Sequence, residues 1–339
     1  MTDTDSGSVS DLPGSVRSRV YRDGKVVAQD VGFEQLVEFR SDESASIWVD
    51  LLEPSGQVLS KFMGAVAGDV ELRPYLLDRL LSARGRPRVL RFADHKVVHT
   101  KAANFDTATR RLRTTDVVVL VFHRWLVTLR SGPGFRTEGV LEEWDDNADL
   151  AHEGVAFLLH GVLGELIDGY LDVLDDLDEE INDVEDDLLD GSGPGRSIQV
   201  RTFELRRAVA ALSRIALPMT EVVAVLTRGG PGETAMGPLL QDVYQHAIRS
   251  AERIDGLRDS IESILSTSLA MQGNSLNEIM KKLTAWAAII AIPTGVTGYF
   301  GQNVPFPGFG QASGFWFSAV LLVSLALGLY VMFKRRNWL

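Results

Sequence analysis

Two stretches near the end of the chain contain no charged residue, and they constrain the fold more than any other feature. They cover residues 283–300 and 315–333 and are 18 and 19 residues long. A helix of about 20 apolar residues crosses the roughly 30 Å hydrocarbon core of a bilayer. Both stretches are therefore predicted to be transmembrane helices attached to a charged, water-facing body, residues 1–282. A buried helical hairpin in a soluble core is the alternative interpretation.

Basic residues flank the two spans. Lys281 and Lys282 precede the first span, and Lys334–Arg336 follow the second. Because Lys and Arg are enriched at cytoplasmic span ends, both termini are predicted to be cytoplasmic, in a bacterial-type inner (plasma) membrane. The loop 301–314 would then emerge on the far side. Residues 1–15 are acidic and polar, so we expect disorder there and no signal peptide.

Composition argues against several classes of function. The chain has no cysteine, which excludes disulfides, thiolate metal sites and cysteine nucleophiles. Its net charge of −12 argues against nucleic acid as a partner, since phosphate binding needs clustered Lys and Arg. The six histidines form no tight ligand cluster in the sequence, and no nucleophile motif is present. We therefore predict a protein that is not an enzyme and needs no cofactor.

The part before the spans divides into an α/β region and a helical region. We place a cytoplasmic α/β domain at 16–150, with a mixed or antiparallel sheet and a helix at 73–83 between the strands. Its strand candidates are rich in β-branched and aromatic residues and lie at 47–52, 96–99, 117–122 and 125–129. Cytoplasmic helices are predicted for 151–238, giving an α+β membrane protein.

The helical region begins with an acidic helix. Residues 165–190 contain 13 Asp or Glu and no Lys or Arg, yet keep an apolar stripe at helical spacing. The acidic face is either simply solvated or a surface that attracts cations. A second helix is predicted from about 197 to 228, with a kink at Pro218. Residues 239–300 then read as one helix about 90 Å long, a stalk at 239–282 continuing into the first span, which needs partner helices along its length.

One side of the first span is lined by small or hydroxyl-bearing residues. This stripe comprises Thr284, Ala287, Ala291, Thr294 and Gly298. The opposite side carries large apolar residues, namely Trp286, Ile289, Ile292, Val296 and Tyr299. Small residues permit close helix packing in membranes, but amides at both ends, Asn277 and Asn303, favour the lining of a water-filled pore. A protomer with two spans cannot enclose a pore, so an oligomer is predicted.

These residues resemble the CorA family of divalent-cation channels. The resemblance runs from about Trp48 to the end of the chain. It is strongest in the segments Gln241–Tyr244, Asn277–Thr284, Gly301-Gln302-Asn303 and Lys334–Leu339. The hallmark of the family is Gly-Met-Asn after a tyrosine at the end of the first span. This chain has Gly-Gln-Asn in that place.

The resemblance implies a funnel-shaped homopentamer in a lipid bilayer, with the first spans around the pore. Asn303 would form a ring at the outer mouth, with Gly301 and Gln302 completing the ion-selecting loop. Met280 and Leu283 would form a hydrophobic constriction, with Asn277 just below it. The implied cargo is a divalent metal ion, Mg²⁺ first, with Co²⁺ or Ni²⁺ as further cargo.

Three departures from the family pattern have consequences. Gln302 replaces the family's methionine and either re-tunes the mouth or packs against its neighbours. The loop 301–314 contains no acidic residue to concentrate cations. In the regulatory metal site that the resemblance implies, Asp242 matches one partner, but the other position holds Arg79, with Asp78 beside it. An arginine there could replace the metal by an ion pair with Asp242.

Two other functions stay open at this point. One is a zinc transporter of the ZntB type, whose tripeptide also differs from Gly-Met-Asn in the middle. The other is a membrane-anchored metal sensor that does not conduct. The small-residue stripe argues against the sensor, because an anchor needs no threonines and loop asparagine on one side.

Overall fold

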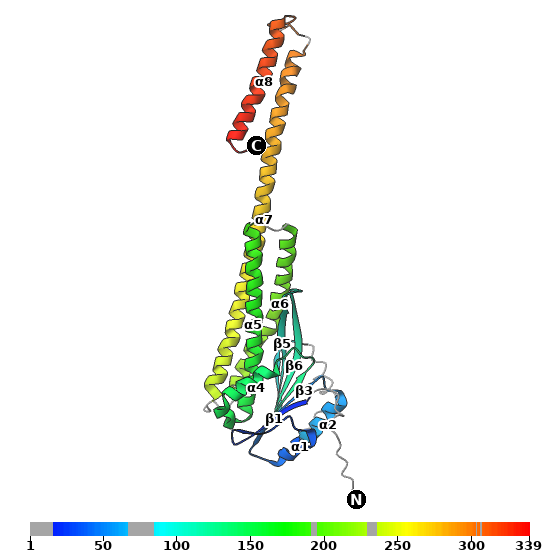
Figure 1. Ribbon diagram of the computed structural model, residues 1–339, viewed down its shortest axis with the longest axis vertical. Coiled ribbons are helices and arrows are strands. Elements are labelled where there is room, and N and C mark those ends of the chain that lie inside the picture. Colours follow the sequence, from blue (N-terminus) through cyan, green and yellow to red (C-terminus); the bar gives the residue numbers. More distant parts are fainter. Residues whose placement is uncertain (1–15, 67–84, 191–194, 229–235, 303, 306) are drawn as a thin grey trace. The chain divides into compact units, whose positions relative to one another are not determined.

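The computed structural model describes residues 16–66, 85–190, 195–228, 236–302, 304–305 and 307–339 (Figure 1). By its internal contacts the chain divides into a first unit, Met1–Ile264, and a second unit, Leu265–Leu339. This division falls inside one long helix, so the domain bounds expected from the sequence stay predictions. The helix predicted for 73–83 lies outside the described residues.

A mixed sheet of seven described strands forms the centre of the first unit, in the order β2-β1-β3-β7-β6-β5-β4 (Figure 1). All neighbouring pairs are antiparallel except β3 and β7, which are parallel. The strands are β1 (Val16–Arg22), β2 (Lys25–Gln29), β3 (Ala45–Leu52), β4 (Arg88–Arg91), β5 (Lys96–Asp106), β6 (Arg111–Val121) and β7 (Trp125–Arg130). The four predicted runs fall on β3, β5, β6 and β7, which confirms the mixed α/β domain.

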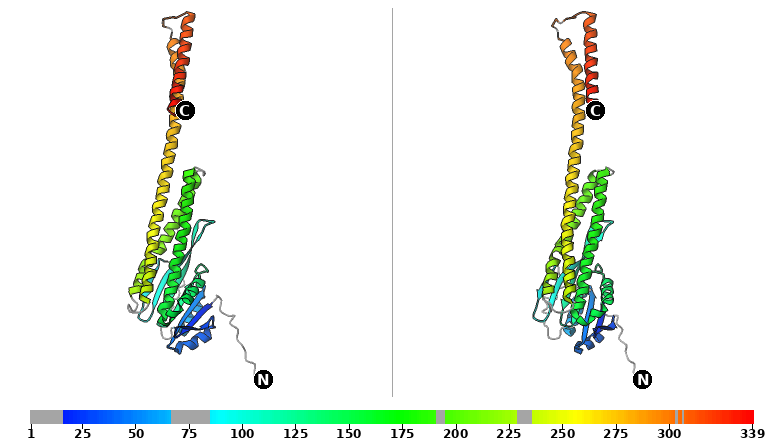
Figure 2. Two further views of the ribbon diagram at one scale, coloured as in Figure 1. Left: turned by 60° about the vertical axis from the view of Figure 1, so that its left-hand side comes forward. Right: turned by 90° about the vertical axis from the view of Figure 1, so that its left-hand side faces the viewer.

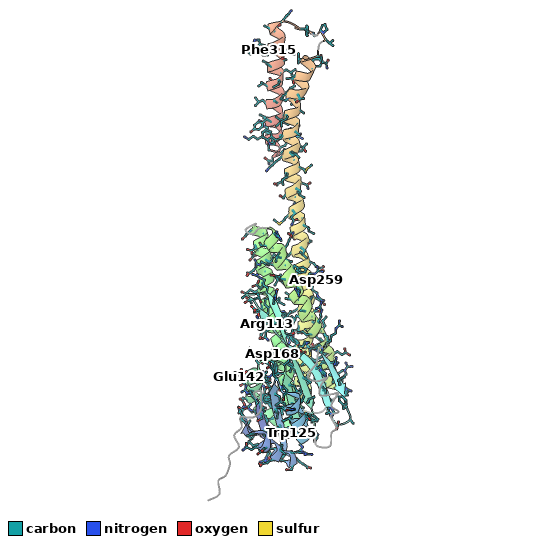
Figure 3. The ribbon with its side chains drawn as sticks, turned by 90° about the vertical axis from the view of Figure 1, so that its right-hand side faces the viewer. Arg113, Trp125, Glu142, Asp168, Asp259 and Phe315 are labelled. Carbon is teal, nitrogen blue, oxygen red and sulfur yellow. The ribbon has the colours of Figure 1, made fainter. Side chains whose placement is uncertain are left out.

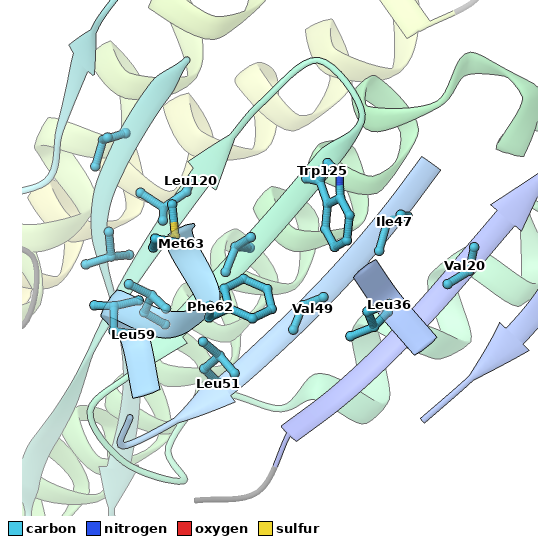
Figure 4. Packing of buried hydrophobic residues seen from close by; sticks show 14 of the residues in the cluster. Val20, Leu36, Ile47, Val49, Leu51, Leu59, Phe62, Met63, Leu120 and Trp125 are labelled. Atoms are coloured by element: carbon cyan, nitrogen blue, oxygen red, sulfur yellow. The ribbon is translucent and has the colours of Figure 1, made fainter. Parts of the chain in front are cut away.

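One face of the sheet packs against α1 (Phe33–Glu38) and α2 (Gly56–Val66). Side chains of a strand point alternately to its two faces, and on this face those of β3 are Ile47, Val49 and Leu51. The helices cover them with Leu36, Leu59, Phe62 and Met63, all of them buried (Figure 4). A short 3-10 turn, η2 (Phe39–Ser41), follows α1. This face holds the main hydrophobic core of the domain.

The other face is covered by α5 (Val155–Asp190) and α6 (Gly195–Arg228), preceded by α4 (Thr137–Asp146) and the 3-10 turn η3 (Ala148–Glu153). Thr100 of β5 contacts both long helices. Its hydroxyl lies 3.4 Å from the Tyr170 hydroxyl of α5 and donates to the Met219 sulfur of α6 at 3.1 Å. The two helices run antiparallel beside the sheet (Figures 1 and 2).

The long helices confirm the helical part of the prediction, with different bounds. The acidic stretch belongs to α5, which begins ten residues earlier than the stretch, at Val155. Helix α6 continues without a break through Pro218, where a kink was expected. Helix α7 (Met236–Phe300) has 65 residues and is the single helix expected from 239 to 300.

The second unit consists of the later part of α7 and of α8 (Ala312–Arg335), which lie side by side and antiparallel (Figures 1 and 2). By length and composition α6, α7 and α8 could each cross a membrane. In α6, however, 56% of the apolar window is buried in the protein, against 6% in α7 and none in α8. The apolar residues of α6 are therefore used by the first unit, and two membrane helices remain, as predicted.

A buried ion pair joins the two parallel strands. Arg130 of β7 donates to both carboxylate oxygens of Asp50 on β3, at 2.6 to 3.0 Å, and Thr128 donates to the same carboxylate at 2.6 Å. The Asp50 side chain is fully buried and that of Arg130 is 7% exposed. Arg130 also reaches the Phe135 carbonyl at 3.2 Å. The pair thus holds β3, β7 and the segment after β7 together.

Asp50→Leu is expected to lower the midpoint of thermal unfolding of the first unit by about 10 °C. Breaking a buried ion pair costs about 3–5 kcal/mol, because the partner charge stays buried without compensation. The double variant Asp50→Leu, Arg130→Met should recover most of the loss, since no unpaired charge remains. Circular dichroism of the detergent-purified protein measures both. Equal losses in the single and double variants would contradict this account.

Candidate functional site

The small-residue stripe of the first span is uncovered in the single chain. Its five members, Thr284, Ala287, Ala291, Thr294 and Gly298, are all exposed. They lie on one face of α7, which stays helical through Pro293. The stripe is therefore free for a partner outside the chain or for water.

Helix α8 covers a different face of α7. Ala285 is fully buried, and Ile289, Ile292 and Val296 are half-buried, at the three- and four-residue spacing of one helix face. On α8 the least exposed residues also form a line, from Gly314 to Phe333. The side of the first span that carries the large apolar residues is thus partly used for packing within the chain, whereas Trp286 and Tyr299 are exposed. The small residues are not needed for contact between α7 and α8.

The threonines near the C-terminal end of α7 have their hydroxyl protons engaged in hydrogen bonds. Thr294 donates to the Ile290 carbonyl at 3.3 Å, and Thr297 donates to the Pro293 carbonyl at 2.7 Å. Such bonds to the preceding turn satisfy the hydroxyl proton inside a membrane helix. The oxygen lone pairs stay available, so Thr294 presents a neutral hydrogen-bond acceptor on the stripe.

Residues predicted to form the gate line one hollow of about 490 Å³ in the second unit. Asn277, Met280 and Thr284 lie in its wall, together with Trp338 from the end of the chain. The Trp338 ring stacks on Phe333 with centroids 5.5 Å apart, and its backbone N–H donates to the Phe333 carbonyl at 3.0 Å. Leu283 is 61% exposed and does not line the hollow. The structure thus brings Asn277 and Met280 together and leaves Leu283 apart.

At the C-terminal end of α7 the chain turns out of the helix at Gly301. Its N–H donates to the Thr297 carbonyl at 2.8 Å, and a Cβ at this position would lie 2.7 Å from the same oxygen. Because backbone cannot move aside as a flexible side chain does, the position requires glycine. Gln302 follows and is exposed. Asn303 lies outside the described residues, so its role stays a prediction.

Comparison with known proteins identifies the family. The model described as CorA-like Mg2+ transporter protein matches residues 43–335. The chain belongs to this family. It is 26% identical over 310 residues to the cobalt/magnesium transport protein CorA of Thermotoga maritima, covering 90% of this chain and 87% of that protein. It is also 25% identical over 275 residues to the zinc transport protein ZntB of Yersinia enterocolitica, covering 77% and 80%.

The fold agrees with that of a solved relative. The structure of the CorA magnesium transporter from Methanocaldococcus jannaschii matches with a TM-score of 0.71 at 21% identity, over 96% of this chain and 98% of that one. The resemblance to CorA seen in the sequence is therefore confirmed, as is the fold class. The roles of the individual pore residues stay predictions.

A histidine lies beside Asp242, the residue that the CorA resemblance assigned to a regulatory metal site. The Nε2 atom of His246 lies 3.6 Å from Asp242, one turn away on α7, and its Nδ1 atom lies 3.6 Å from Asp168 on α5. Asp168 is labelled in Figure 3. Burial raises the pKa of the Asp168 carboxyl, which His246 opposes. No group of three metal-ligating side chains occurs in the part of the chain that the structure describes. Asp78 and Arg79 lie outside it.

Sequence reasoning did not predict that His246 lies between two carboxylates. It treated the six histidines as scattered, although the four-residue spacing of Asp242 and His246 on a helix was visible and puts them on one face. Asp168 could not be found in this way, because it comes from another helix. The neighbouring His160 is buried, and burial lowers its pKa.

A second hollow, of about 220 Å³, lies between the end of β5, the segment before α4 and the side of α5. Glu165, Asp172 and Asp176 line it together with Arg136, which pairs with Glu165 at 3.1 Å. Burial is the largest cause that raises the pKa of Glu165 to about 7, and Arg136 opposes it. Glu165 therefore titrates near neutral pH, a property that the sequence alone did not indicate.

Gly301→Ala is expected to lower Mg²⁺ uptake by about tenfold, equivalent to 1.4 kcal/mol of strain at the mouth. The added Cβ meets backbone at 2.7 Å, so the end of α7 must shift. Gly295→Ala is the matched control, because a Cβ there meets nothing within 4 Å. Uptake per amount of protein in proteoliposomes measures both. Equal rates in the two variants would show that the turn at Gly301 tolerates a side chain.

Proposed function

We propose that this chain forms a homopentameric channel that passes divalent cations, chiefly Mg²⁺, down their electrochemical gradient. One observation carries the proposal: the stripe from Thr284 to Gly298 is small, uncharged and left uncovered by α8. A helix that only anchors the protein would need nothing but large apolar residues facing the lipid, and would have no use for such a stripe. A neutral stripe with hydroxyl acceptors serves a file of water and hydrated ions.

The oligomer follows from the geometry of one chain. Two membrane helices lie side by side and enclose nothing between them, so several copies must place their stripes around a common axis. Membership of the CorA family supports this arrangement, and the family resemblance supplies the number five. In it Asn277, Met280 and Leu283 narrow the inner end and Asn303 rings the outer end.

The chemistry of the mouth suits a hydrated ion. Mg²⁺ loses its water reluctantly, so a ring of neutral amides can accept hydrogen bonds from the bound waters without stripping them. A ring of carboxylates would hold the ion more tightly, whereas conduction needs binding that is favourable but weak. The loop 301–314 contains no charged residue, which is consistent with this mode.

The driving force needs no nucleotide. Each charge that crosses gains about 2.3 kcal/mol per 100 mV of membrane potential, so a divalent ion is drawn strongly into a negative interior. We place the protein in the inner (plasma) membrane with both termini in the cytoplasm, on the basis of Lys281, Lys282 and Lys334–Arg336. Co²⁺ and Ni²⁺ are further cargo in this proposal.

A zinc transporter is the second candidate. It is favoured by the identity to ZntB and by Gln302, an amide where the Mg²⁺ channels of the family carry methionine. Flux into proteoliposomes that contain separate Mg²⁺ and Zn²⁺ dyes separates the candidates. Mg²⁺ entry driven by an imposed potential supports the channel. Zn²⁺ entry that requires a proton gradient supports the transporter, and no flux of either metal favours a non-conducting sensor.

Asn303→Ala is expected to reduce potential-driven Mg²⁺ entry at least tenfold while the oligomer stays intact. The substitution removes the amide that would accept hydrogen bonds from the hydrated ion at the mouth. Gln311→Ala, which removes another amide from the same loop, is the control and should retain full flux. Native mass spectrometry verifies assembly. Normal flux in Asn303→Ala would rule out the proposed mouth ring.

Gln302→Met is expected to change ion preference and leave the oligomer unchanged. It restores the tripeptide of the family and removes one amide per chain from the mouth. We expect the ratio of Zn²⁺ to Mg²⁺ flux to fall, because a middle residue other than methionine is what this chain has in common with the zinc candidate. Competition between the two metals in one proteoliposome assay measures the ratio. An unchanged ratio would assign Gln302 to packing against its neighbours.

A further inference from the structure

The loop between α7 and α8 ends in a tight turn that is held by backbone hydrogen bonds. The Gln311 N–H donates to the Gly308 carbonyl at 3.1 Å, and Gly310, the third residue of this turn, has a φ of +76°. A type II turn requires a positive φ at its third residue. The Gly314 N–H donates in its turn to the Gln311 carbonyl at 3.1 Å. The turn thus leads directly into the first turn of α8.

Gly308 and Gly314 lie in direct backbone contact across this segment. A Cβ on Gly314 would lie 2.9 Å from the Gly308 carbonyl carbon and closer still to the carbonyl oxygen. A Cβ on Gly308 would lie 3.1 Å from the Gly314 Cα atom, and Gly308 has a φ of +91°. Gly314 is buried inside α8, although glycine destabilises a helix relative to alanine. The contact, here called the glycine clasp, accounts for glycine at both positions.

The beginning of α8 also holds the other end of the loop. The ring of Phe317 packs edge to face against the ring of Phe300, with centroids 6.4 Å apart. Phe300 is the last residue of α7. Phe317 follows Gly314 by three residues, and residues three apart share a face of a helix. One face of α8 therefore holds both residues that flank the loop 301–307.

The loop 301–307 carries the Gly-Gln-Asn tripeptide. At its start the chain leaves α7 at Gly301, and at its end it enters the glycine clasp. Pro305 and Pro307 lie within it, and a proline ring fixes the φ angle of its residue. A short loop with two prolines has few ways to absorb a shift of one end. A shift of the clasp is therefore expected to move Gln302 and the rest of the tripeptide.

We infer that Gly308 and Gly314 are positioning residues of the ion-selecting loop, whose clasp on α8 sets where the tripeptide stands at the mouth of the pore. The inference rests on the proposed function, which assigns ion recognition to this loop. Neutral amides bind a hydrated ion weakly, as conduction requires. The loop 301–314 has no charged residue that could compensate for misplaced amides. Ion binding then depends on how well the loop is held.

Gly314→Ala tests the inference in the full-length protein. We expect the Mg²⁺ concentration for half-maximal uptake to rise about tenfold and the rate at saturating Mg²⁺ to change less than about twofold, because the loss is in binding at the mouth. Gly328→Ala is the control in the same helix, since a Cβ there meets nothing within 4 Å. Uptake by proteoliposomes at graded Mg²⁺ and fixed potential measures both variants. A defect in assembly alone would lower the saturating rate and leave the half-maximal concentration unchanged.

Gly308→Ala tests the same contact from its other side and is the milder change. Its Cβ meets one atom at 3.1 Å, which a small shift can relieve. We expect the half-maximal concentration to rise in the same direction. Because both substitutions act through one contact, the double variant should show less than the product of the two single effects. Effects that multiply in full would mean two separate causes and would contradict the clasp.

Hydrogen exchange tests the clasp without transport. In the purified protein, exchange of the Gln311 amide should be at least about tenfold faster in Gly314→Ala than in Gly328→Ala, because its bond to Gly308 opens more often. Mass spectrometry of a peptide that covers the turn measures the rate. An unchanged rate would overturn the inference, since the contact would then restrain nothing.

The outcomes separate the clasp from the proposed function. Uptake by the wild type, with the same half-maximal concentration in all glycine variants despite faster exchange at Gln311, would overturn the positioning role and leave transport standing. If the wild type passes neither Mg²⁺ nor Zn²⁺, the proposed function fails and the positioning role fails with it. Faster exchange together with weaker Mg²⁺ binding in Gly314→Ala supports both.

Discussion

Helix α7 meets two solvents along one uninterrupted backbone, and the rest of the chain is arranged around that constraint. Its first part forms polar bonds with the first unit, such as those of Arg253 and Arg258. Its last part, after Lys282, carries no charge. A backbone in hydrocarbon must satisfy its own hydrogen bonds, which a continuous helix does. The continuity of α7 through Pro293 is therefore a requirement of its surroundings as well as a property of its sequence.

The rest of the chain covers only part of the surface of its long helices. In the membrane part α8 covers the face of Ile292, and the small stripe stays uncovered. In the first unit the sheet, the neighbouring helix and α7 cover α5 and α6 on three sides, and each keeps one free edge. The uncovered surfaces differ in kind, since one is small and neutral and the others carry opposite charges. A chain that assembles with copies of itself would be expected to leave both kinds of surface uncovered.

Much of this arrangement could be predicted from the sequence, because it depends on local pattern. Strand runs such as 117–122, the continuous helix from 239 to 300 and the two charge-free spans are set by residues near one another in the chain. The spacing of Thr284, Ala287 and Ala291 was enough to define a face. That α8 would cover Ile289, Ile292 and Val296 was not evident, because all large apolar residues look equally suited to lipid.

What could not be predicted depends on distant pairings. Asp50 and Arg130 read as ordinary polar residues in two apolar strands until β3 and β7 pair in parallel. His246 lies between two carboxylates, and one of them comes from a helix far away in the sequence. The sequence assigned Gly301 to the ion-selecting loop, but the reason that a side chain does not fit there, the Thr297 carbonyl oxygen 2.7 Å from a Cβ at this position, needs coordinates. Charge at such positions is informative only once the fold supplies the neighbour.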